Sequence, residues 1–319
     1  MITIMILIIS LLGLIWAGSH IVTGAVGIAH AYRMSPLFIG LTLIALGTSI
    51  PTIYFAIVNA LADQTDFVVS NAIGSNIANI GLVLGLTILL CPPKIHSVLF
   101  RSGYPLLFLT MLITYTLMIG EYFSVADGCF LLLTTIALIA YLAILTKQSM
   151  HGSTHVKSFR AATQARRTMT FNLISLLIGF IVIAFSAHYF TQSIVHIAQG
   201  FQVNEVVIQL TIIAIGTSLP GLATCVIAAL KGQDQLAVGT ILGTNMFNLM
   251  AVLAFPGMIS PSAISPHVIW RDMPMMLALT FVIFLINYNS KRKMIRWHGG
   301  LLLLIYGCYL TSLIYNAVL

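Results

Sequence analysis

The composition of the chain places it in a membrane. Of its 319 residues, 59% are hydrophobic and only 7% are charged, whereas ordinary soluble domains carry roughly a quarter charged residues. A water-soluble globular protein is therefore excluded. A helical membrane span needs about 20 mostly apolar residues, so roughly ten spans fit in the chain. We expect the lipid bilayer as its partner, and no nucleic acid despite the net charge of +7.

The cysteines offer neither a disulfide framework nor a zinc site. They are scattered, mostly in apolar runs, and no Cys-x-x-Cys or Cys-x-x-His spacing occurs among them. The four are Cys91, Cys129, Cys225 and Cys308. We interpret them as small apolar packing residues and expect no cofactor.

Apolar runs separated by charges and turn residues predict an all-α membrane protein of about ten transmembrane helices. The expected spans cover residues 3–31, 37–61, 67–91, 103–120, 125–146, 170–199, 206–230, 236–257, 273–289 and 297–318. The first apolar run has no basic stretch before it and no small-residue cleavage motif after it. It therefore predicts a first span rather than a removed signal peptide.

Basic residues collect on one side of this layout. All of them except Arg271 lie in loops that follow odd-numbered spans. The positive-inside rule then places these loops in the cytoplasm and both termini outside. The sequence predicts no carboxylate inside a span, because the acidic residues fall in loops. Those expected in outer loops are Asp63, Asp66, Glu121, Asp127, Glu205 and Asp272. A compact inner-membrane protein of a prokaryote, with periplasmic termini, is the expected setting.

The chain also contains an internal repeat. At a constant offset of 169 residues, the segment 39–51 aligns with 208–220, and 74–79 aligns with 243–248 without a gap. Each half holds five spans, an odd number, so the second half must enter the membrane from the opposite face. Such inverted repeats are typical of secondary transporters that bind substrate near the membrane midplane.

This repeat predicts the division of the chain. The first five-span half covers 1–146 and contains repeat 1 at about 35–85. The second covers 170–319 and contains repeat 2 at about 204–254. Between them, 147–169 carries several basic residues and no acidic one, which indicates a cytoplasmic linker lying against anionic headgroups.

Two motifs recur in the repeats. In Gly-Thr-Ser-x-Pro, the rings of Pro51 and Pro220 lack an N–H donor and clash with the carbonyl four residues back, so we expect the helix to open there. In hydrocarbon, loosened backbone is tolerated only inside the protein or beside a cavity. In Gly-Ser/Thr-Asn-x-x-Asn, two amides share one helix face. Hard cations prefer such neutral oxygens. These residues also suit helix packing, but two copies in inverted halves favour a ligand site.

At these motifs the sequence resembles the calcium/cation antiporter superfamily, which includes the sodium/calcium exchangers and calcium/proton exchangers. The resemblance covers both repeats and the ten-span layout. It implies that spans 2, 3, 7 and 8 form a compact core around ion sites, and that spans 1 and 6 slide across this core to alternate access. It also implies a ligand set at matching positions. This set comprises Thr48, Ser49, Ser75, Asn79, Thr217, Ser218, Thr244 and Asn248, with the carbonyls of Ala45 and Ala214.

The sequence departs from the family where an acidic residue should follow each motif proline. Thr52 and Gly221 occupy those positions, so both signature glutamates are missing. A dehydrated dication needs neutralising charge, and neutral oxygens coordinate without neutralising. Calcium binding is therefore doubtful, whereas a monovalent cation such as sodium remains a candidate at these positions. Reaching a midplane site from Asp63 or Asp66 would require a large shift of span 3.

Two histidines lie in the spans expected to slide. His20 in span 1 aligns at the offset of 169 with the residue next to His188 in span 6. Protonatable groups inside a span are functional candidates, so a proton relay that replaces the glutamates is one hypothesis. The alternative is a neutral histidine hydrogen-bonded to a neighbouring helix or located near an interface.

The sequence thus predicts a transporter rather than an enzyme, and no catalytic residues. The main hypothesis is a secondary active cation antiporter with atypical ion selectivity. Retention of Pro51, Pro220 and the hydroxyl set favours it. Loss of both glutamates favours a degenerate, non-transporting member with a structural or regulatory role. A third hypothesis, a carrier of a neutral or anionic solute, follows from the uncharged site and the helix termini that could face an anion.

Overall fold

The computed structural model describes residues 2–32, 34–93, 103–152, 168–201, 208–289 and 294–318. In this part of the chain, nine helices are long and apolar enough to cross a membrane, and a shorter apolar helix spans Tyr104–Met118. The prediction of an all-helical membrane fold with about ten apolar helices is therefore confirmed. The protein is a multi-pass membrane protein.

The helices of the first half follow in chain order, with η marking a π-helical stretch. They are α1 (Ile2–Ala31), α2 (Pro36–Ile39), η1 (Gly40–Ile44), α3 (Ala45–Leu61), α4 (Thr65–Ala78), η2 (Asn79–Leu84), α5 (Gly85–Leu90), α6 (Tyr104–Met118) and α7 (Val125–Gly152), with strand β1 (Tyr122–Phe123) before α7. The helix α7 extends six residues into the expected linker. Residues 153–167 of that linker lie outside the described residues.

The second half repeats the order of the long helices, but its strand and an additional π-helical stretch come before its fourth long helix. Its elements are α9 (Met169–Gly200), η4 (Ile208–Ile213), α11 (Ala214–Leu230), α12 (Asp234–Phe247), η5 (Asn248–Val252), α13 (Leu253–Ile259), β2 (Ser262–Ala263), η6 (Val268–Asp272), α14 (Met273–Asn289) and α15 (Arg296–Val318). The offset of 169 carries the bounds of α3 onto those of α11, and the start of α4 and end of α5 onto the start of α12 and end of α13. Local sequence therefore builds the same structure twice.

The expectation that the helices open at the motif prolines is wrong. Pro51 lies inside α3 and Pro220 lies inside α11, and both helices continue past the ring. The irregular backbone lies a few residues earlier, in the π-helical stretches η1 and η4. A π-helical turn is wider than an α-helical turn and is frequent at functional sites.

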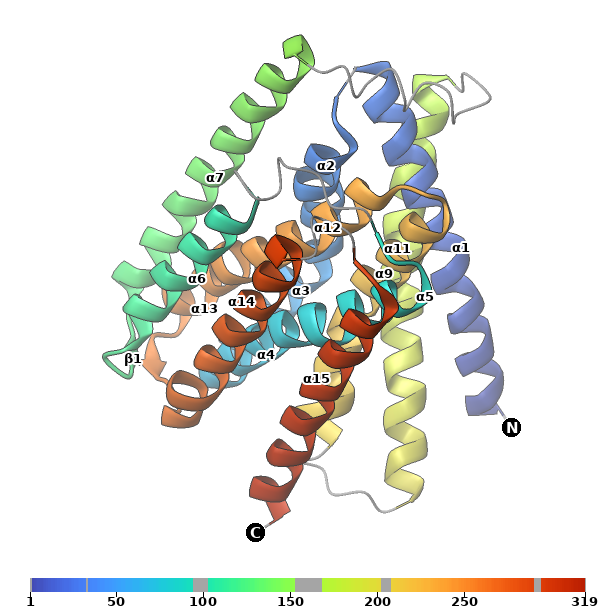
Figure 1. Cartoon of the computed structure of the whole chain (residues 1–319). Helices are drawn as coiled ribbons and strands as arrows, with labels where there is room; N and C mark the ends of the chain where they lie inside the picture. Colours follow the sequence, from blue (N-terminus) through green and yellow to red (C-terminus); the bar gives the residue numbers. More distant parts are fainter. Residues whose placement is uncertain are drawn as a thin grey trace.

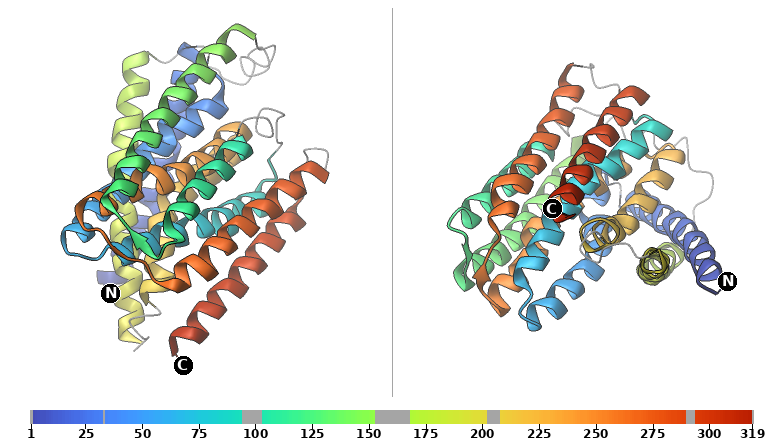
Figure 2. Two further views of the ribbon diagram at one scale, coloured as in Figure 1. Left: turned by 90° about the vertical axis from the view of Figure 1, so that its left-hand side faces the viewer. Right: turned by 90° about the horizontal axis from the view of Figure 1, so that it is seen from below.

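Two large apolar clusters hold the described helices together. The larger joins α4, α12, α13 and α14 with α6 and α7, and the smaller joins α1 and α9 to α11 and α12. Figure 1 shows α1 and α9 running side by side at one edge of the molecule, and the view from below in Figure 2 separates this pair from most of the other helices. Small residues permit the close approach, since a Cβ atom on Gly24 would lie 2.6 Å from the Asn172 carbonyl oxygen.

One end of the bundle is closed by polar contacts between the halves. The strands β1 and β2 pair antiparallel. Asp66 Oδ1 accepts a hydrogen bond from the Ser265 backbone N–H at 2.7 Å, and Asp63 Oδ1 accepts one from Ser260 Oγ at 2.8 Å. Both carboxylates, which lie near the start of α4, are therefore hydrogen-bonded to the loop that follows α13.

The expectation that no carboxylate lies inside a span is also wrong. Asp272 is 6% exposed and lies in a helix that is apolar enough to cross a membrane from Val268 to Tyr288. The π-helical turn η6 begins this span earlier than the sequence pattern indicates. The charge is compensated, because Arg271 Nε donates to Asp272 Oδ1 at 2.7 Å and the Tyr309 hydroxyl donates to the same oxygen at 3.0 Å.

Candidate ion-binding site

Four hydroxyl groups from the repeated motifs meet in two pairs between the halves. The Oγ1 atoms of Thr48 and Thr244 lie 3.4 Å apart, and Ser75 Oγ lies 2.8 Å from Thr217 Oγ1. The offset of 169 converts Thr48 to Thr217 and Ser75 to Thr244. The two contacts are therefore one pair formed twice, once by α3 with α12 and once by α4 with α11.

Four asparagines form a second set of paired contacts. Asn79 Nδ2 donates to Asn245 Oδ1 at 2.8 Å, and Asn248 Nδ2 donates to Asn76 Oδ1 at 3.0 Å. These bonds are again equivalent under the offset of 169. All four side chains are buried. Because buried amides must be hydrogen-bonded to be tolerated, this network fixes the register between α4 and α12.

One asparagine contact has no counterpart in the other half. Asn76 Nδ2 donates to the Asn245 carbonyl oxygen at 3.2 Å and lies 3.6 Å from the sulfur of Met276 on α14. The residue at the position equivalent to Met276 is Leu107, which has no acceptor atom. Asn245 Nδ2 is buried and has no hydrogen-bond partner among the described residues. The two halves therefore differ at the centre of an otherwise paired network.

Three oxygen atoms at the motifs are buried and have no partner among the described residues. They are Ser49 Oγ, Ser218 Oγ and Asn248 Oδ1. The two serines are equivalent under the offset of 169, so each half contains the same buried hydroxyl without a described partner. A buried polar group without a partner costs about 1–3 kcal/mol. Such atoms indicate a ligand or a bound water molecule.

The backbone carbonyls, and the two positions that lack the family's glutamate, complete the candidate ligand set. Thr48 Oγ1 lies 2.9 Å from the Ile44 carbonyl and 3.1 Å from the Ala45 carbonyl, and donates to them. Ala214 begins α11 at the position equivalent to Ala45. Thr52 is buried in α3, one turn after Thr48. A Cβ atom on Gly221 would meet only Asn79 Oδ1 within 4 Å, at 3.9 Å, so α11 has room for a larger side chain.

The site contains no formal charge in the part of the chain that the structure describes. Its side chains are hydroxyls and amides, and no group of three or more His, Cys, Asp and Glu residues that could hold a metal ion occurs among the described residues. Neutral oxygens are ligands for hard cations, but they leave the charge of the ion uncompensated. Whether these residues bind an ion stays a prediction.

The structure gives the two histidines different surroundings. His20 Nδ1 lies 2.9 Å from Ser175 Oγ on α9, and its ring stacks on Trp16 with centroids 4.0 Å apart. His188 is exposed on α9, and its ring meets the neighbouring ring of Tyr189 edge-on. His20 therefore joins α1 to α9 by a hydrogen bond, as the second interpretation expected. No contact among the described residues connects either histidine to the paired hydroxyls.

The predicted ligand set omits two of the four asparagines. Asn76 and Asn245 join the halves, yet the resemblance assigns a ligand role only to Asn79 and Asn248. The signal that could have found them is the motif itself, which repeats both asparagines with the same spacing. Buried amides at two corresponding positions need partners, and the inverted partner motif is the nearest source.

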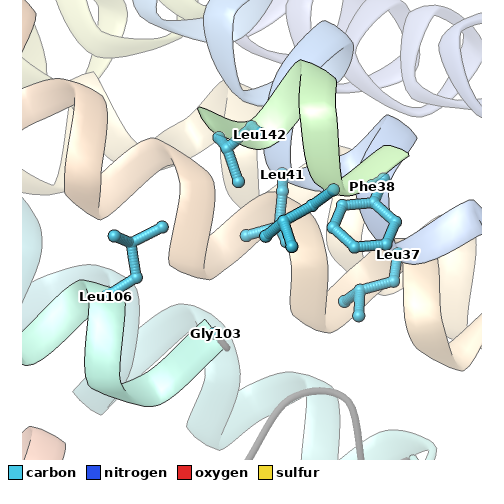
Figure 3. A pocket seen from close by; sticks show the side chains of 7 residues that line it. Leu37, Phe38, Leu41, Gly103, Leu106 and Leu142 are labelled. Carbon is cyan, nitrogen blue, oxygen red and sulfur yellow. The ribbon is translucent and has the colours of Figure 1, made fainter. Parts of the chain in front are cut away.

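A pocket elsewhere in the molecule differs in character. Side chains of α2, η1, α6 and α7 point into it, and Figure 3 shows leucine and phenylalanine side chains around it. It has no space for a water-sized solute at its centre. Its lining offers no polar group to an ion, so it does not compete with the paired motifs as a candidate site.

The chain is similar to known membrane proteins over nearly its full length. Residues 2–150 and 171–315 match the family described as sodium/calcium exchanger protein. CaxA of Alkalimonas amylolytica is 34% identical over 300 residues, which cover 93% of this chain and 94% of that protein. The inner membrane protein YrbG of Escherichia coli strain K12 is 31% identical over 298 residues, with 93% and 92% covered.

A solved structure supports the same relationship. The sodium-calcium exchanger NCX_Mj, soaked with 2.5 mM Na+ and 10 mM Sr2+, superimposes with a TM-score of 0.82 at 26% identity, and 98% of each chain is covered. The family match and the structural likeness both include the repeated motifs. The chain therefore belongs to the sodium/calcium exchanger family of cation antiporters.

Proposed function

We propose that the protein exchanges cations by alternating access and that its central site favours a monovalent cation, sodium, over calcium. The observation that supports this proposal is the pair of buried serine hydroxyls, Ser49 and Ser218, which lack partners and lie in a site of neutral oxygens. A monovalent ion brings half the charge of a dication into that site. Its uncompensated charge is therefore less costly.

The buried carboxylate of the described chain does not supply the missing negative charge in this proposal. Asp272 is the one buried carboxylate among the described residues, and both of its oxygens are engaged by Arg271 at 2.7 and 3.2 Å. The Tyr309 hydroxyl donates to one of the same oxygens at 3.0 Å, so the carboxylate is occupied by its own partners. Asp272 therefore serves the structure of η6 and α15 in this proposal, and exchange depends on the hydroxyl and amide oxygens.

The test is ion flux in proteoliposomes under calcium, sodium and proton gradients. The native chain is compared with a Thr52→Glu, Gly221→Glu variant, which adds two carboxylates. A Thr52→Gln, Gly221→Gln variant adds the same bulk without charge and serves as the matched control. The open space beside Gly221 makes the larger side chain acceptable in α11.

We expect the native chain and the glutamine variant to move sodium and not calcium, and the glutamate variant to move calcium. Calcium uptake by the native chain against a sodium or proton gradient would show that neutralising charge is not required at these positions. A native chain that moves no cation, beside a glutamate variant that moves calcium, would indicate that the native site is silent and would favour a structural or regulatory role.

One observation favours a second candidate, a solute that carries acceptor atoms. Asn245 Nδ2 is a buried donor without a partner among the described residues, and a bare cation cannot satisfy it. A neutral or anionic solute could accept from it while donating to Asn248 Oδ1. Flux that persists when sodium is replaced by choline, and that is lost in Asn245→Leu, would support this candidate over sodium exchange.

The setting of the protein follows from its charge distribution. We propose an inner-membrane location with both termini in the periplasm, since YrbG is an inner membrane protein and the basic residues of this chain lie in odd-numbered loops. Labelling of single cysteines added at each terminus by a membrane-impermeant thiol reagent in intact cells tests the orientation. Labelling only after the membrane is permeabilised contradicts it.

A further inference from the structure

The helix α9 faces the motif helices α3 and α11 with one row of side chains. Phe180, Ala184, Ala187 and Thr191 recur at helical spacing and therefore share a face. At one end of the row, a Cβ atom on Gly47 of α3 would lie 2.1 Å from Phe180 Cζ. The phenyl ring therefore lies directly against the Gly47 backbone, with no space for a side chain between them.

The other end of the row meets the equivalent glycine of the second half. A Cβ atom on Gly216 of α11 would lie 2.3 Å from Thr191 Oγ1. Gly47 and Gly216 are the first residues of the two Gly-Thr-Ser-x-Pro motifs. Since 11 residues of α-helix rise about 16 Å, α9 extends over the gap between the two motifs and covers the candidate site from one side.

The close contact of a glycine of α1 with α11 lies at a different position along α11. The helix α1 approaches α11 at Gly18, where an added Cβ atom would lie 2.7 Å from Ile227 Cδ1 and 3.2 Å from the Ala223 carbonyl oxygen. These residues lie after the motif proline rather than at the motif glycine. The close contacts at the two motif glycines are therefore both made by α9.

The two ends of the α9 row differ in chemistry. The Phe180 ring offers no hydrogen bond, and a constriction lined by apolar groups stops ions because it excludes their hydration water. The Thr191 hydroxyl donates to the Ala187 carbonyl at 2.8 Å and keeps its lone pairs available as an acceptor. One end is therefore apolar and the other offers an oxygen to a passing cation.

We propose that Phe180 is the gating residue of this protein: seated on Gly47, its ring seals the route to the candidate site between α9 and α3. Opening of this route requires the ring to leave Gly47. The route between α9 and α11 is bordered instead by the Thr191 hydroxyl. The meaning of the seal for ion traffic rests on the proposed antiport, but the seal itself is a property of packing and is measured without transport.

The first test measures the accessibility of the two motif serines. In a chain whose four cysteines are replaced by alanine, Ser49→Cys and Ser218→Cys are labelled separately with a small cationic methanethiosulfonate reagent. Adding Phe180→Ala should raise the labelling rate at position 49 by about tenfold, because the route opens locally. The rate at position 218 should change little.

Leu176→Ala is the matched control on the same helix. Its side chain packs toward α1, where a Cβ atom on Gly24 would lie 3.1 Å from Leu176 Cβ. The change loosens α9 without touching Gly47. An unchanged rate at position 49 in Phe180→Ala, or an equal rise in Leu176→Ala, overturns the proposal.

A second test applies if the cysteine variants fail to fold. Gly47→Ala should lower the melting temperature in detergent because its Cβ atom meets the Phe180 ring, and Phe180→Ala in the same chain should recover part of the loss. Gly307→Ala is the control, since a Cβ atom there meets nothing within 4 Å. If the effects of the two changes on the melting temperature are additive, the proposed contact of the Phe180 ring with the Gly47 backbone is contradicted. Absence of cation flux in the native chain would instead contradict the proposed function and leave the seal intact.

Discussion

The centre and the ends of this molecule treat charge in opposite ways. At the centre, the motif side chains are neutral, and the hydroxyl and amide contacts between the halves occur twice under one offset. Toward one end, Asp272 pairs with Arg271, and the residue equivalent to Asp272 in the first half is Gly103. The motif side chains are therefore uncharged in both halves, and the Arg271–Asp272 pair occurs in the second half only.

This difference shows where each kind of interaction is tolerated. A charge inside a membrane is expensive unless it is paired, and the Asp272 carboxylate has both a guanidinium and a phenol as partners. Both carboxylate oxygens of Asp272 are engaged by these partners, so neither is available to coordinate a passing ion. The central oxygens remain available to an ion, because no cationic side chain binds them in the part of the chain that is described.

The largest effect is expected at the centre, from Asn76→Leu. The change leaves Asn248 Nδ2 and the Asn245 carbonyl without this partner, at about 1–3 kcal/mol for each group. The loss of free energy of unfolding is measured by thermal melting in detergent. Asn59→Leu is the control, because in the described part of the chain its amide bonds only to the Phe55 carbonyl of its own helix. Equal losses in both variants would mean that the network between the halves contributes nothing beyond an ordinary polar contact.

A smaller loss of stability is expected from Asp272→Leu. Breaking a buried ion pair from one side costs about 3–5 kcal/mol, but the Arg271 side chain is 30% exposed and can turn to water. We therefore expect about 2 kcal/mol. Sodium-dependent stabilisation, measured as the rise in melting temperature with sodium, should be unchanged. A loss of that stabilisation would show that the charged end takes part in ion binding, and the contrast with the centre would fail.

A still smaller effect is expected from Lys231→Met at the end of α11. The Lys231 ammonium donates to Ser19 Oγ at 2.7 Å, and to the Ser19 carbonyl and Thr23 Oγ1 at 3.1 Å each, all on α1. This side chain is exposed, so its contribution is about 1 kcal/mol. Hydrogen exchange at the Ser19 and Thr23 amides should become faster. Lys231→Arg, which keeps the charge, should retain most of the protection, and equal exchange in both variants would mean that Lys231 does not hold α1.

The smallest effect is expected at the histidines. If flux varies with pH, a proton relay requires His20→Ala or His188→Ala to abolish that dependence, whereas unchanged profiles in both variants exclude the relay. His20 is the more informative position, because its ring is held between Ser175 and Trp16. His20→Gln can keep the hydrogen bond to Ser175 and separates loss of packing from loss of a titrating group.

The sequence predicts the elements well because both repeats encode them independently. Apolar runs and the offset of 169 locate the helices, and the structure places η1 and α3 where the first motif lies and η4 and α11 where the second lies. The same reasoning fails at Pro51, because the rule for an isolated proline does not foresee that α3 continues past the ring. It fails at Asp272 because a paired carboxylate can extend a span, and Tyr309, 37 residues away, is not visible as its partner.

The partners of the asparagines also lie beyond local reasoning. The motif predicts that Asn76 and Asn79 share a face, but not which amide of the second half each one meets. That choice depends on how α4 and α12 cross, and the crossing is set by packing over the whole core. Gly47 is a further example, since its contact with Phe180 joins helices that are more than 130 residues apart. A glycine in a motif predicts close approach without naming the group that approaches.

The crossed pairing of the motifs bears on the ancestry of the fold. Thr48 meets the equivalent of Ser75, and Asn79 meets the equivalent of Asn76, so every direct pair joins two different positions of one repeat. A homodimer of a single five-helix unit, inserted in both orientations, would form the same four pairs across its two-fold axis. In a single chain the two copies need not be identical, and here they differ at Thr52 and Gly221 and within the hydroxyl pairs at Ser75 and Thr244.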